Sequence, residues 1–310
     1  MLNQITIHQL DLFLVAAKLK NFSRAADQMA ISQPAFSAQI IKLEKILGSP
    51  MFERIGRRIE LTDAGMAFEV YAQRTIGALR EGKQAIDDMT KKVVGTLRLG
   101  ASTTVANYIL PEFLGKYKKA HPQGKVEMMV GNTNQIEQSL LRGEVDLGIV
   151  EGPVKNNNIE TYLFKNDELV VIFSSTHSWK NRRTVSMDEL KKEPLIIRER
   201  GSGTRKVFMD QVDFDHNPLN VVMELGDTEA IKKSAQANLG VAVVSRAAIT
   251  SELKDKSLRC ASLDGVSLRR KLTLIILKNR YLSNPLKAFT AILDPIEKVA
   301  ENKPAHRDNS

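Results

Sequence analysis

Cysteine, aromatic residues and long apolar runs are all scarce in this chain of 310 residues. The single cysteine, Cys260, excludes an intrachain disulfide, and the five histidines are scattered without metal-ligand spacing. We therefore expect no metal site and no Cys/His catalytic pair. No stretch approaches the roughly 18 consecutive apolar residues of a membrane span, and the first residues do not resemble a secretory signal. The expected location is the cytoplasm, with no membrane partner.

Positive charge is in excess, with 45 Lys+Arg against 36 Asp+Glu and a formal net charge of +9. This balance favours a polyanionic partner, but the excess is divided between the first 92 residues and the rest of the chain. Its diagnostic value is therefore small by itself. A hydrophobic content of 43% at this length predicts a globular protein of two or three domains.

Apolar residues recur at helical spacing in three segments of the first 48 residues, which predicts three short helices around one core. The third helix follows Ser32, a good N-cap, has Pro34 in its first turn and ends at Gly48. Residues 51–61 then indicate two short strands around Gly56. The stripe that the third helix buries is Phe36, Ile40, Leu43 and Leu47.

The outward face of the third helix carries small residues first and basic residues after them. Pro34, Ala35 and Ala38 point away from the apolar stripe, and Lys42 follows one turn later. Such a face fits a DNA major groove, where polar side chains near the helix N-terminus reach base edges and lysines meet phosphates. The preceding helix and its tight turn complete a helix-turn-helix.

The arginines of the predicted hairpin would form a wing that grips the DNA backbone or the minor groove. A three-helix bundle with a solvated basic hairpin is the alternative that this pattern leaves open. The residues expected to contact DNA are Ser23, Ser32, Gln33, Pro34, Ala35, Ser37, Ala38, Gln39, Lys42, Arg54, Arg57 and Arg58.

Residues 62–92 contain no proline, and the pattern predicts one long helix that Thr62 caps. At 1.5 Å per residue such a helix reaches about 45 Å, which is long for the surface helix of a monomer. Ile76, Leu79 and Ile86 belong to an apolar seam that suits a partner helix. We expect these three residues in a dimer contact; packing on the same chain is the alternative.

From residue 93 onward strands and helices alternate, which predicts βαβ units, a largely parallel sheet and two α/β lobes. Lobe I is expected at about 93–163 and 268–300, and lobe II at about 164–267. The strand-like runs are 96–100, 126–130, 145–150, 169–173, 195–198, 221–224, 241–244 and 272–277.

Several motifs of the first 65 residues, in this order and spacing, resemble the LysR-type transcriptional regulators. They are FSRAA at 22–26, SQPAFS at 32–37, LE at 43–44, LG at 47–48, FER at 52–54, RR at 57–58 and LTDAG at 61–65. The resemblance implies an α/β protein with a winged helix-turn-helix at 1–61, a dimerising linker helix at 62–92 and a two-lobed effector domain at 93–310. That domain would be similar to periplasmic binding proteins. Ala38 departs from the family, because many members carry a basic residue there.

Three strand-to-helix junctions, at 101–104, 131–133 and 200–205, place small hydroxyl or amide residues where a helix begins. Free N–H groups at such junctions bind anions, and ligands gather at the carboxyl ends of strands. The resemblance implies a small metabolite between the lobes. The expected effector-binding residues are Ser102, Thr103, Thr104, Gly131, Asn132, Thr133, Val150, Glu151, Arg200, Gly201, Ser202, Gly203, Thr204, Asp227 and Thr228. We expect a small oxyanion or carboxylate with Arg200 or Arg205 as countercharge; Glu151 would oppose a highly charged ligand or bind its hydroxyl or ammonium group.

Together these patterns predict a sequence-specific transcriptional regulator with no catalytic residues and no cofactor. Its expected partners are double-stranded DNA with a roughly palindromic site, a small anionic metabolite and itself, as a homodimer or homotetramer; RNA polymerase is a further candidate. The stretches 198–205 and 226–229 are similar to family members that control sulfur assimilation or carbon fixation. The alternatives are an α/β solute-binding or enzymatic protein with an interaction helix bundle, and a nonspecific nucleoid-binding protein.

Overall fold

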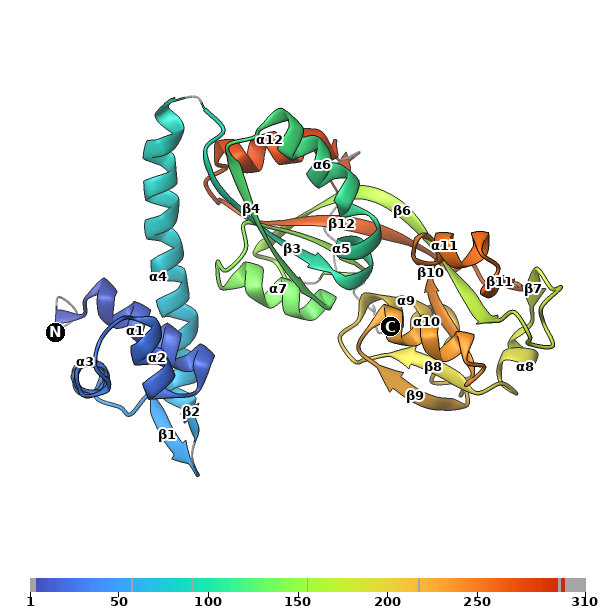
Figure 1. The fold of residues 1–310 in the computed structure, drawn as a ribbon, viewed down its shortest axis with the longest axis horizontal. Coiled ribbons are helices and arrows are strands. Elements are labelled where there is room, and N and C mark those ends of the chain that lie inside the picture. Colours follow the sequence, from blue (N-terminus) through green and yellow to red (C-terminus); the bar gives the residue numbers. More distant parts are fainter. Residues whose placement is uncertain are drawn as a thin grey trace, which may run out of the picture. The chain divides into compact units, whose positions relative to one another are not determined.

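A computed structural model describes residues 4–56, 58–90, 92–154, 156–216, 218–294 and 297–298 (Figure 1). These residues form two compact units. A helical unit contains the chain up to Met89 together with Arg142–Glu144, and an α/β unit contains the remainder. Among the described residues no helix is both long and apolar enough to cross a membrane.

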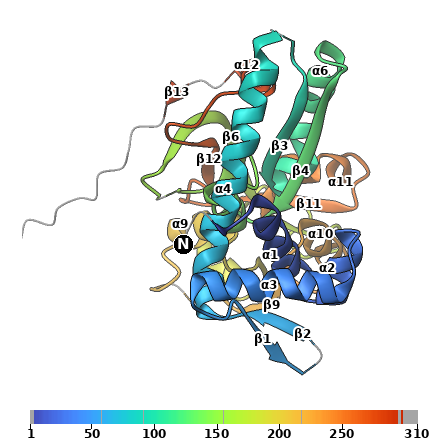
Figure 2. The same cartoon turned by 90° about the vertical axis from the view of Figure 1, so that its left-hand side faces the viewer.

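The helical unit contains the three predicted short helices, and side-chain caps begin each of them. Thr6, Asn21 and Ser32 accept hydrogen bonds from backbone N–H groups of the first turns. An antiparallel hairpin follows, and it projects away from the helices where α4 begins (Figure 2). The elements are α1 (Ile7–Leu19), α2 (Phe22–Gln28), α3 (Gln33–Leu47), β1 (Phe52–Ile55), β2 (Arg58–Leu61), α4 (Asp63–Asp87) and the 3₁₀ turn η2 (Asp88–Thr90).

The long helix α4 begins as predicted, because the Thr62 side chain accepts a hydrogen bond from the N–H of Gly65. It ends earlier than expected, at Asp87, where the chain tightens into η2. Its 25 residues give a rod of about 38 Å, compared with the expected 45 Å.

The α/β unit is built on one continuous path of strands, in the order β4-β3-β5-β12-β6-β10-β8-β9. The prediction of a largely parallel sheet is wrong for its centre. Strands β3, β4 and β5 pair in parallel at one end, and β8 pairs in parallel with β9 and β10 at the other. Between them β12 and β6 run antiparallel to their neighbours, because these two strands carry the chain from one lobe to the other.

The elements of this unit alternate along the chain, as expected, although several short strands were not predicted. They are β3 (Gly95–Ser102), α5 (Thr103–Tyr108), α6 (Leu110–Ala120), β4 (Gly124–Gly131), α7 (Thr133–Leu141), β5 (Leu147–Glu151), β6 (Ile159–Ser174), β7 (Thr184–Val185), α8 (Met187–Leu190), β8 (Leu195–Arg198), α9 (Gly203–Gln211), β9 (Val221–Leu225), α10 (Thr228–Gln236), β10 (Val241–Ser245), η3 (Arg246–Ile249), α11 (Thr250–Lys254), β11 (Leu258–Leu263), β12 (Arg269–Leu277), α12 (Asn284–Leu293) and β13 (Glu297–Lys298).

Separate apolar cores divide the α/β unit into two lobes. Lobe I packs β3, β5 and the second half of β12 against α5, α6 and α12, whereas lobe II packs β8, β10 and the end of β6 against α9 and α10. Phe164 of β6 belongs to the first core and Leu169 to the second, so β6 crosses between them within this interval. The crossing lies slightly beyond residue 163, where lobe I was expected to give way to lobe II.

Candidate DNA-binding surface and effector pocket

The orientation of α3 follows from its buried stripe. Phe36, Ile40 and Leu43 are fully buried in the core of the helical unit, as the spacing predicts. The Ser32 side chain caps the helix, and Gly48 ends it at φ 74°, in the left-handed region that glycine adopts freely. The opposite face is therefore exposed, and it carries Pro34, Ala35, Ala38, Lys42 and Lys45.

Polar side chains around the start of α3 are held by hydrogen bonds. Ser23 of α2 donates to Oε1 of Gln33 over 3.1 Å, and Gln9 of α1 donates to Oε1 of Gln39 over 3.2 Å. Ser37 is half-buried. These bonds fix the two glutamine side chains at the edges of the exposed face. The sequence reading missed Ile41, which is exposed beside Ala38 and Lys42; a helical wheel would have shown it on this side.

The hairpin places exposed arginines next to α3. Arg54 and Arg58 border a groove of about 250 Å³, the remaining walls of which come from the start of α2, from Gln33 and from the hairpin turn. The groove thus joins basic side chains of the wing to polar side chains of α2 and α3. Arg57, also predicted to contact DNA, lies outside the described residues. The groove is lined by Asn21, Phe22, Ser23, Gln33, Arg54, Gly56, Arg58 and Ile59.

The apolar seam of α4 is only partly available to a partner. Leu79 and Ile86 are 50% and 67% exposed, as expected for a dimer contact. Ile76 corrects the prediction, because it is 5% exposed and packs in the core of its own helical unit. Ile76 shares the helical spacing of Leu79 and Ile86, but the turn of α4 that contains Ile76 packs against the short helices of its own unit. Met66, Tyr71 and Met89 are further exposed apolar residues of this segment.

Both strand-to-helix junctions predicted in lobe I are present, and their polar side chains differ in whether they make hydrogen bonds. Ser102 begins α5, but its hydroxyl makes no capping bond; it is buried and has no partner among the described residues. Thr133 begins α7 and donates from Oγ1 to the carbonyl of Glu151 over 2.7 Å. Asn132 accepts from the N–H of Gln135 over 3.0 Å. Val150 corrects the prediction, since its side chain is fully buried in an apolar core of lobe I and does not face a cleft.

The junction of lobe II approaches lobe I closely at Gly203, the first residue of α9. A Cβ built at Gly203 would lie 2.0 Å from the carbonyl oxygen of Glu151 and 2.7 Å from Oγ1 of Thr133, so only glycine fits there. Gly201 has φ 89°, and its carbonyl accepts from the N–H of Asn134 over 3.4 Å. We call five residues around this contact the interlobe boundary: Thr133, Glu151, Gly203, Thr204 and Arg270.

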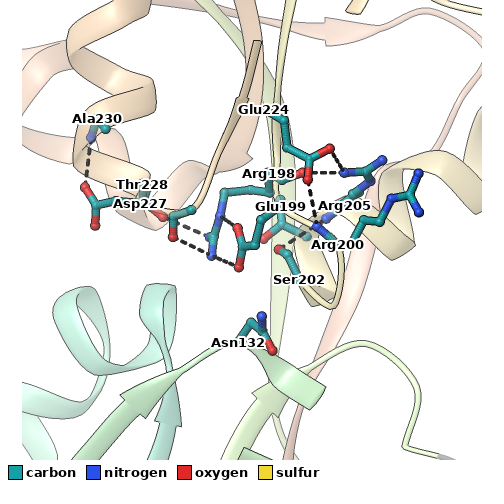
Figure 3. A network of polar contacts seen from close by, with 12 residues as sticks. Asn132, Arg198, Glu199, Arg200, Ser202, Arg205, Glu224, Asp227, Thr228 and Ala230 are labelled. Atoms are coloured by element: carbon teal, nitrogen blue, oxygen red, sulfur yellow. Dashed lines mark hydrogen bonds and ion pairs between the residues drawn. The ribbon is translucent and has the colours of Figure 1, made fainter. Parts of the chain in front are cut away.

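Arginines of lobe II are bound to carboxylates of the same lobe (Figure 3). Arg198 is buried, donates to Oγ1 of Thr228 over 3.1 Å and pairs with Glu199 over 2.8 Å. Arg205 donates to Glu224 over 2.6 Å, and this bond lowers the pKa of the Glu224 carboxyl. The countercharge predicted from Arg205 is therefore already engaged, whereas Arg200 is exposed. Figure 3 also shows Asn132 of lobe I opposite the Ser202 loop.

A second polar contact joins the lobes through α5 and α10. The hydroxyl of Tyr108 on α5 donates to the carboxylate of Glu229 on α10. The ammonium of Lys232, which is buried and also paired with Glu252, lies 5.0 Å from the centre of the Tyr108 ring. Burial and the hydrogen bond to Glu229 raise the pKa of Tyr108 to about 12. Asp227 caps α10 through the N–H of Ala230, so its side chain is engaged within lobe II.

A cavity of about 630 Å³ opens between the lobes, on the side of α7 and α9. It brings together six of the predicted effector residues, namely Thr133, Glu151, Arg200, Gly201, Ser202 and Gly203. The others do not line it: Ser102, Thr103, Thr104, Gly131, Asn132, Val150, Thr204, Asp227 and Thr228. Arg205, predicted as a possible countercharge, also lines the cavity. The sequence did not mark the rest of the wall: Asn134, Glu137, Pro153, Lys206, Met209, Asp210, Asp213, Phe214 and Asp215.

The chemistry of this cavity is mixed. Carboxylates outnumber basic groups on its wall, and Lys206 is paired with Asp210 over 2.5 Å. Burial raises the pKa of the Glu137 carboxyl. The groups suited to a small anion are the Arg200 guanidinium and the N–H groups of Gly203 and Thr204, which make no hydrogen bond within the helix. The N–H of Arg205 already donates to the Ser202 hydroxyl. Among the described residues no cluster of His, Cys, Asp and Glu could hold a metal ion.

Comparison with known proteins accounts for nearly the whole chain. The LysR substrate binding domain matches residues 90–295, and the bacterial regulatory helix-turn-helix protein family lysR matches residues 7–66. A Trichormus variabilis protein named "Probable RuBisCO transcriptional regulator" is 36% identical over 297 residues, which cover 94% of this chain and 88% of the relative.

Two solved structures extend this likeness. The regulatory domain of CcmR from Synechocystis PCC6803, in complex with 2-PG, is 30% identical with a TM-score of 0.60, covering 64% of this chain and 95% of that one. Full-length CbnR complexed with its target DNA has a TM-score of 0.69 at 21% identity, covering 94% and 99%, and shows the same fold. The resemblance found in the sequence is thereby confirmed: the chain belongs to the LysR family of DNA-binding transcriptional regulators, with a C-terminal effector-binding domain.

Proposed function

We propose that this regulator reads a discrete, roughly palindromic DNA site through the exposed face of α3 and the β1–β2 wing. One observation carries the proposal: the small-then-basic face of α3 is exposed, while Phe36, Ile40 and Leu43 of the opposite stripe are buried and Leu47 is partly buried. Gln33 and Ser37 would meet base edges, Ile41 a thymine methyl group, and Lys42 and Arg58 phosphates. Ala38 offers no hydrogen bond, so Gln39 and Lys42 would carry more of the readout.

Footprinting of the full chain on genomic fragments tests this proposal. We expect discrete protected sites whose half-sites lie about one duplex turn, or a multiple of it, apart. Gln33→Ala should change the preferred sequence, whereas Gln123→Ala, at an exposed turn of the α/β unit, should not. Arg58→Ala should weaken all duplexes and make the salt dependence shallower. Uniform protection without discrete sites would instead favour a nonspecific nucleoid-binding protein.

Self-association is the second part of the proposal. Leu79 and Ile86 of α4 and Met89 of η2 leave an apolar strip that suits a partner helix. A homodimer would present two copies of α3 to one site. A homotetramer of two such dimers would span a longer site. Light scattering of Leu79→Asp, with Arg80→Asp as a control at an exposed position of α4 that points away from this strip, should show smaller particles only for the first variant. RNA polymerase stays a candidate partner.

The effector is proposed to be a small metabolite that binds in the interlobe cavity and changes how the lobes close. The volume of about 630 Å³ lies within the usual range for such ligands. The CcmR complex makes 2-PG a suitable first probe, and Arg200 with the α9 N-terminus supports the anionic ligand that the sequence predicts. A thermal-shift screen of small acids on the full chain, followed by sequencing of bound DNA, tests ligand and targets together.

We further propose that the chain is not an enzyme, uses no cofactor and acts in the cytoplasm, where a DNA-binding regulator meets its sites. The family supports this assignment over the solute-binding or enzymatic alternative. The Trichormus relative supports the similarity to regulators of carbon fixation. Which genes this chain controls, and in which direction, is decided by the sequenced DNA and by transcription from those promoters.

A further inference from the structure

Most basic groups on the wall of the interlobe cavity already have a partner of opposite charge. Lys206 pairs with Asp210 over 2.5 Å. Arg205 pairs with Glu224 over 2.6 Å. The guanidinium of Arg200 differs, because it is exposed and makes no hydrogen bond or ion pair within the part of the chain that the structure describes. Arg200 is therefore the cation of this wall that is available to a ligand.

One carboxylate of the same wall has no cation. Glu137 of α7 is half-buried and makes no hydrogen bond or ion pair among the described residues. Burial alone raises the pKa of its carboxyl, and no neighbouring basic group lowers it. Two other wall carboxylates do have a nearby partner: the hydrogen bond to Asp213 raises the pKa of His216, and the charge of Asp215 adds to the effect. Glu137 is thus the carboxylate best placed to bind a ligand cation.

The free cation and the free carboxylate lie about one helical turn apart. The loop of Arg200 meets the start of α7, because the N–H of Asn134 donates to the carbonyl of Gly201 over 3.4 Å. Thr133 and Glu137, four residues apart on α7, both line the cavity and so share the face that it borders. Four residues extend about 6 Å along the helix axis. The cavity therefore has a basic end at the helix starts and an acidic wall roughly one turn away.

Neither a purely anionic nor a purely cationic ligand fits both groups. An acid alone leaves the Glu137 carboxylate half-buried without a cation, and an amine alone leaves the Arg200 guanidinium and the N–H of Gly203 without an anion. A ligand with one acid group and one ammonium group satisfies both ends through charge-assisted hydrogen bonds. Because the ends are about 6 Å apart, several bonds must separate its two charged groups.

We propose that the interlobe cavity takes a small ω-amino acid, in which about three carbons separate the acid group from the ammonium group. The acid group lies at Arg200 and the start of α9, and the ammonium group lies at Glu137. This inference rests on the proposed effector function. It narrows the ligand from any small acid to one that also carries a distant positive charge.

Four related compounds test this class on the wild-type full chain at about pH 8, where acid and ammonium groups are both charged. 4-Aminobutyrate carries both groups at the required spacing, and 2-aminobutyrate carries them on adjacent carbons. Butyrate lacks the ammonium group, and butylamine lacks the acid group. By ligand-observed NMR titration we expect 4-aminobutyrate to bind roughly 10-fold more tightly than each of the others. Equal affinities for 4-aminobutyrate and butyrate, or tighter binding of 2-aminobutyrate, would overturn the inference.

Two substitutions assign the preference to Glu137. Glu137→Gln keeps the size of the side chain but removes its charge, so 4-aminobutyrate should bind no more tightly than butyrate. Glu137→Lys should reverse the order, so that succinate, with an acid group at each end, binds more tightly than 4-aminobutyrate. Glu168→Gln is the control and should keep the wild-type preference, because Glu168 lines a different groove. A wild-type preference in both Glu137 variants would overturn the assignment.

2-PG separates a failure of this inference from a failure of the proposed effector function. Binding of 2-PG that weakens in Arg200→Ala supports an acid-binding site in the cavity. If 2-PG binds in this way but 4-aminobutyrate has no advantage over butyrate, only the ω-amino acid class is overturned. Absence of binding by every acid, 2-PG included, would overturn both proposals.

Discussion

The exposed face of α3 and the interlobe boundary differ in where their polar side chains lie, at the surface in the first and buried in the second. On α3 the polar and basic side chains are exposed or half-exposed, and the core beneath them is apolar except for the buried Gln9, which donates to Gln39. At the boundary the charged side chains are themselves buried and bonded to one another across elements distant in the chain. Substitutions on α3 should therefore change function alone, whereas substitutions at the boundary should change stability and ligand binding together.

Arg270→Leu should have the largest effect. The variant leaves the carboxylates of Asp167 and Glu151 buried without their cation, and breaking such a pair destabilises by about 3–5 kcal/mol. Urea unfolding followed by fluorescence of Trp179, the single tryptophan, reports on lobe II. Arg269→Leu, at the exposed neighbouring position of β12, should leave the midpoint nearly unchanged. Equal midpoints for both variants would mean that the buried network does not hold the boundary.

Gly203→Ala should have the second largest effect. Its new methyl group would collide with the Glu151 carbonyl, so either α9 or β5 must move, at a cost of about 1–3 kcal/mol. Effector affinity should fall as well, because the same contact forms the cavity wall. Gly226→Ala is the control, since nothing lies within 4 Å of its Cβ position. A stable Gly203→Ala variant that binds ligand normally would show that the lobes meet less tightly than described.

The same contrast explains what the sequence could predict. The bounds of α3 follow from Ser32, Pro34 and Gly48, which act on neighbouring residues, and the exposed face follows from a local period. The bond between Arg270 and Asp167 joins residues 103 positions apart, and no local pattern marks either of them. Much of the cavity wall was missed for this reason, and the part that was predicted lies at strand ends and helix starts.

Ile76 and β6 show the same limit in the fold. Apolar residues repeat at the same helical spacing whether they pack in the core of their own chain or against a partner helix. The sequence of α4 alone therefore could not show that Ile76 is a core residue. The first half of β6 pairs with β12 although it carries Glu160, Lys165 and Asn166. These polar residues gave no strand pattern, although pairing with the distant strand β12 stabilises this part of β6. Local signals thus predicted the helical unit better than the strands that join the lobes.

Tyr108→Phe should have a smaller effect, and its signature is a different dependence of stability on pH in alkali. The folded-state pKa of about 12 exceeds the ordinary value of 10.0, so the folded state keeps a proton that the unfolded state loses. This contribution is fully present below pH 10 and is lost as the pH rises toward 12. Urea midpoints from about pH 9 to about pH 11 should fall more steeply in wild type than in Tyr108→Phe. Tyr71→Phe, on the exposed side of α4, should follow the wild type; parallel curves for all three proteins would exclude this contact as the source.

Lys42→Ala should have the smallest effect on stability and a clear one on DNA. The side chain is exposed on α3, so its removal should change the free energy of unfolding by less than about 0.5 kcal/mol. If Lys42 neutralises one phosphate, the slope of log affinity against log salt should decrease by about 0.9 on every duplex. Lys83→Ala, at an exposed lysine of α4, should change neither quantity. A lower unfolding midpoint in Lys42→Ala, or an unchanged salt slope, would contradict the claim that substitutions on the α3 face change DNA binding without changing stability.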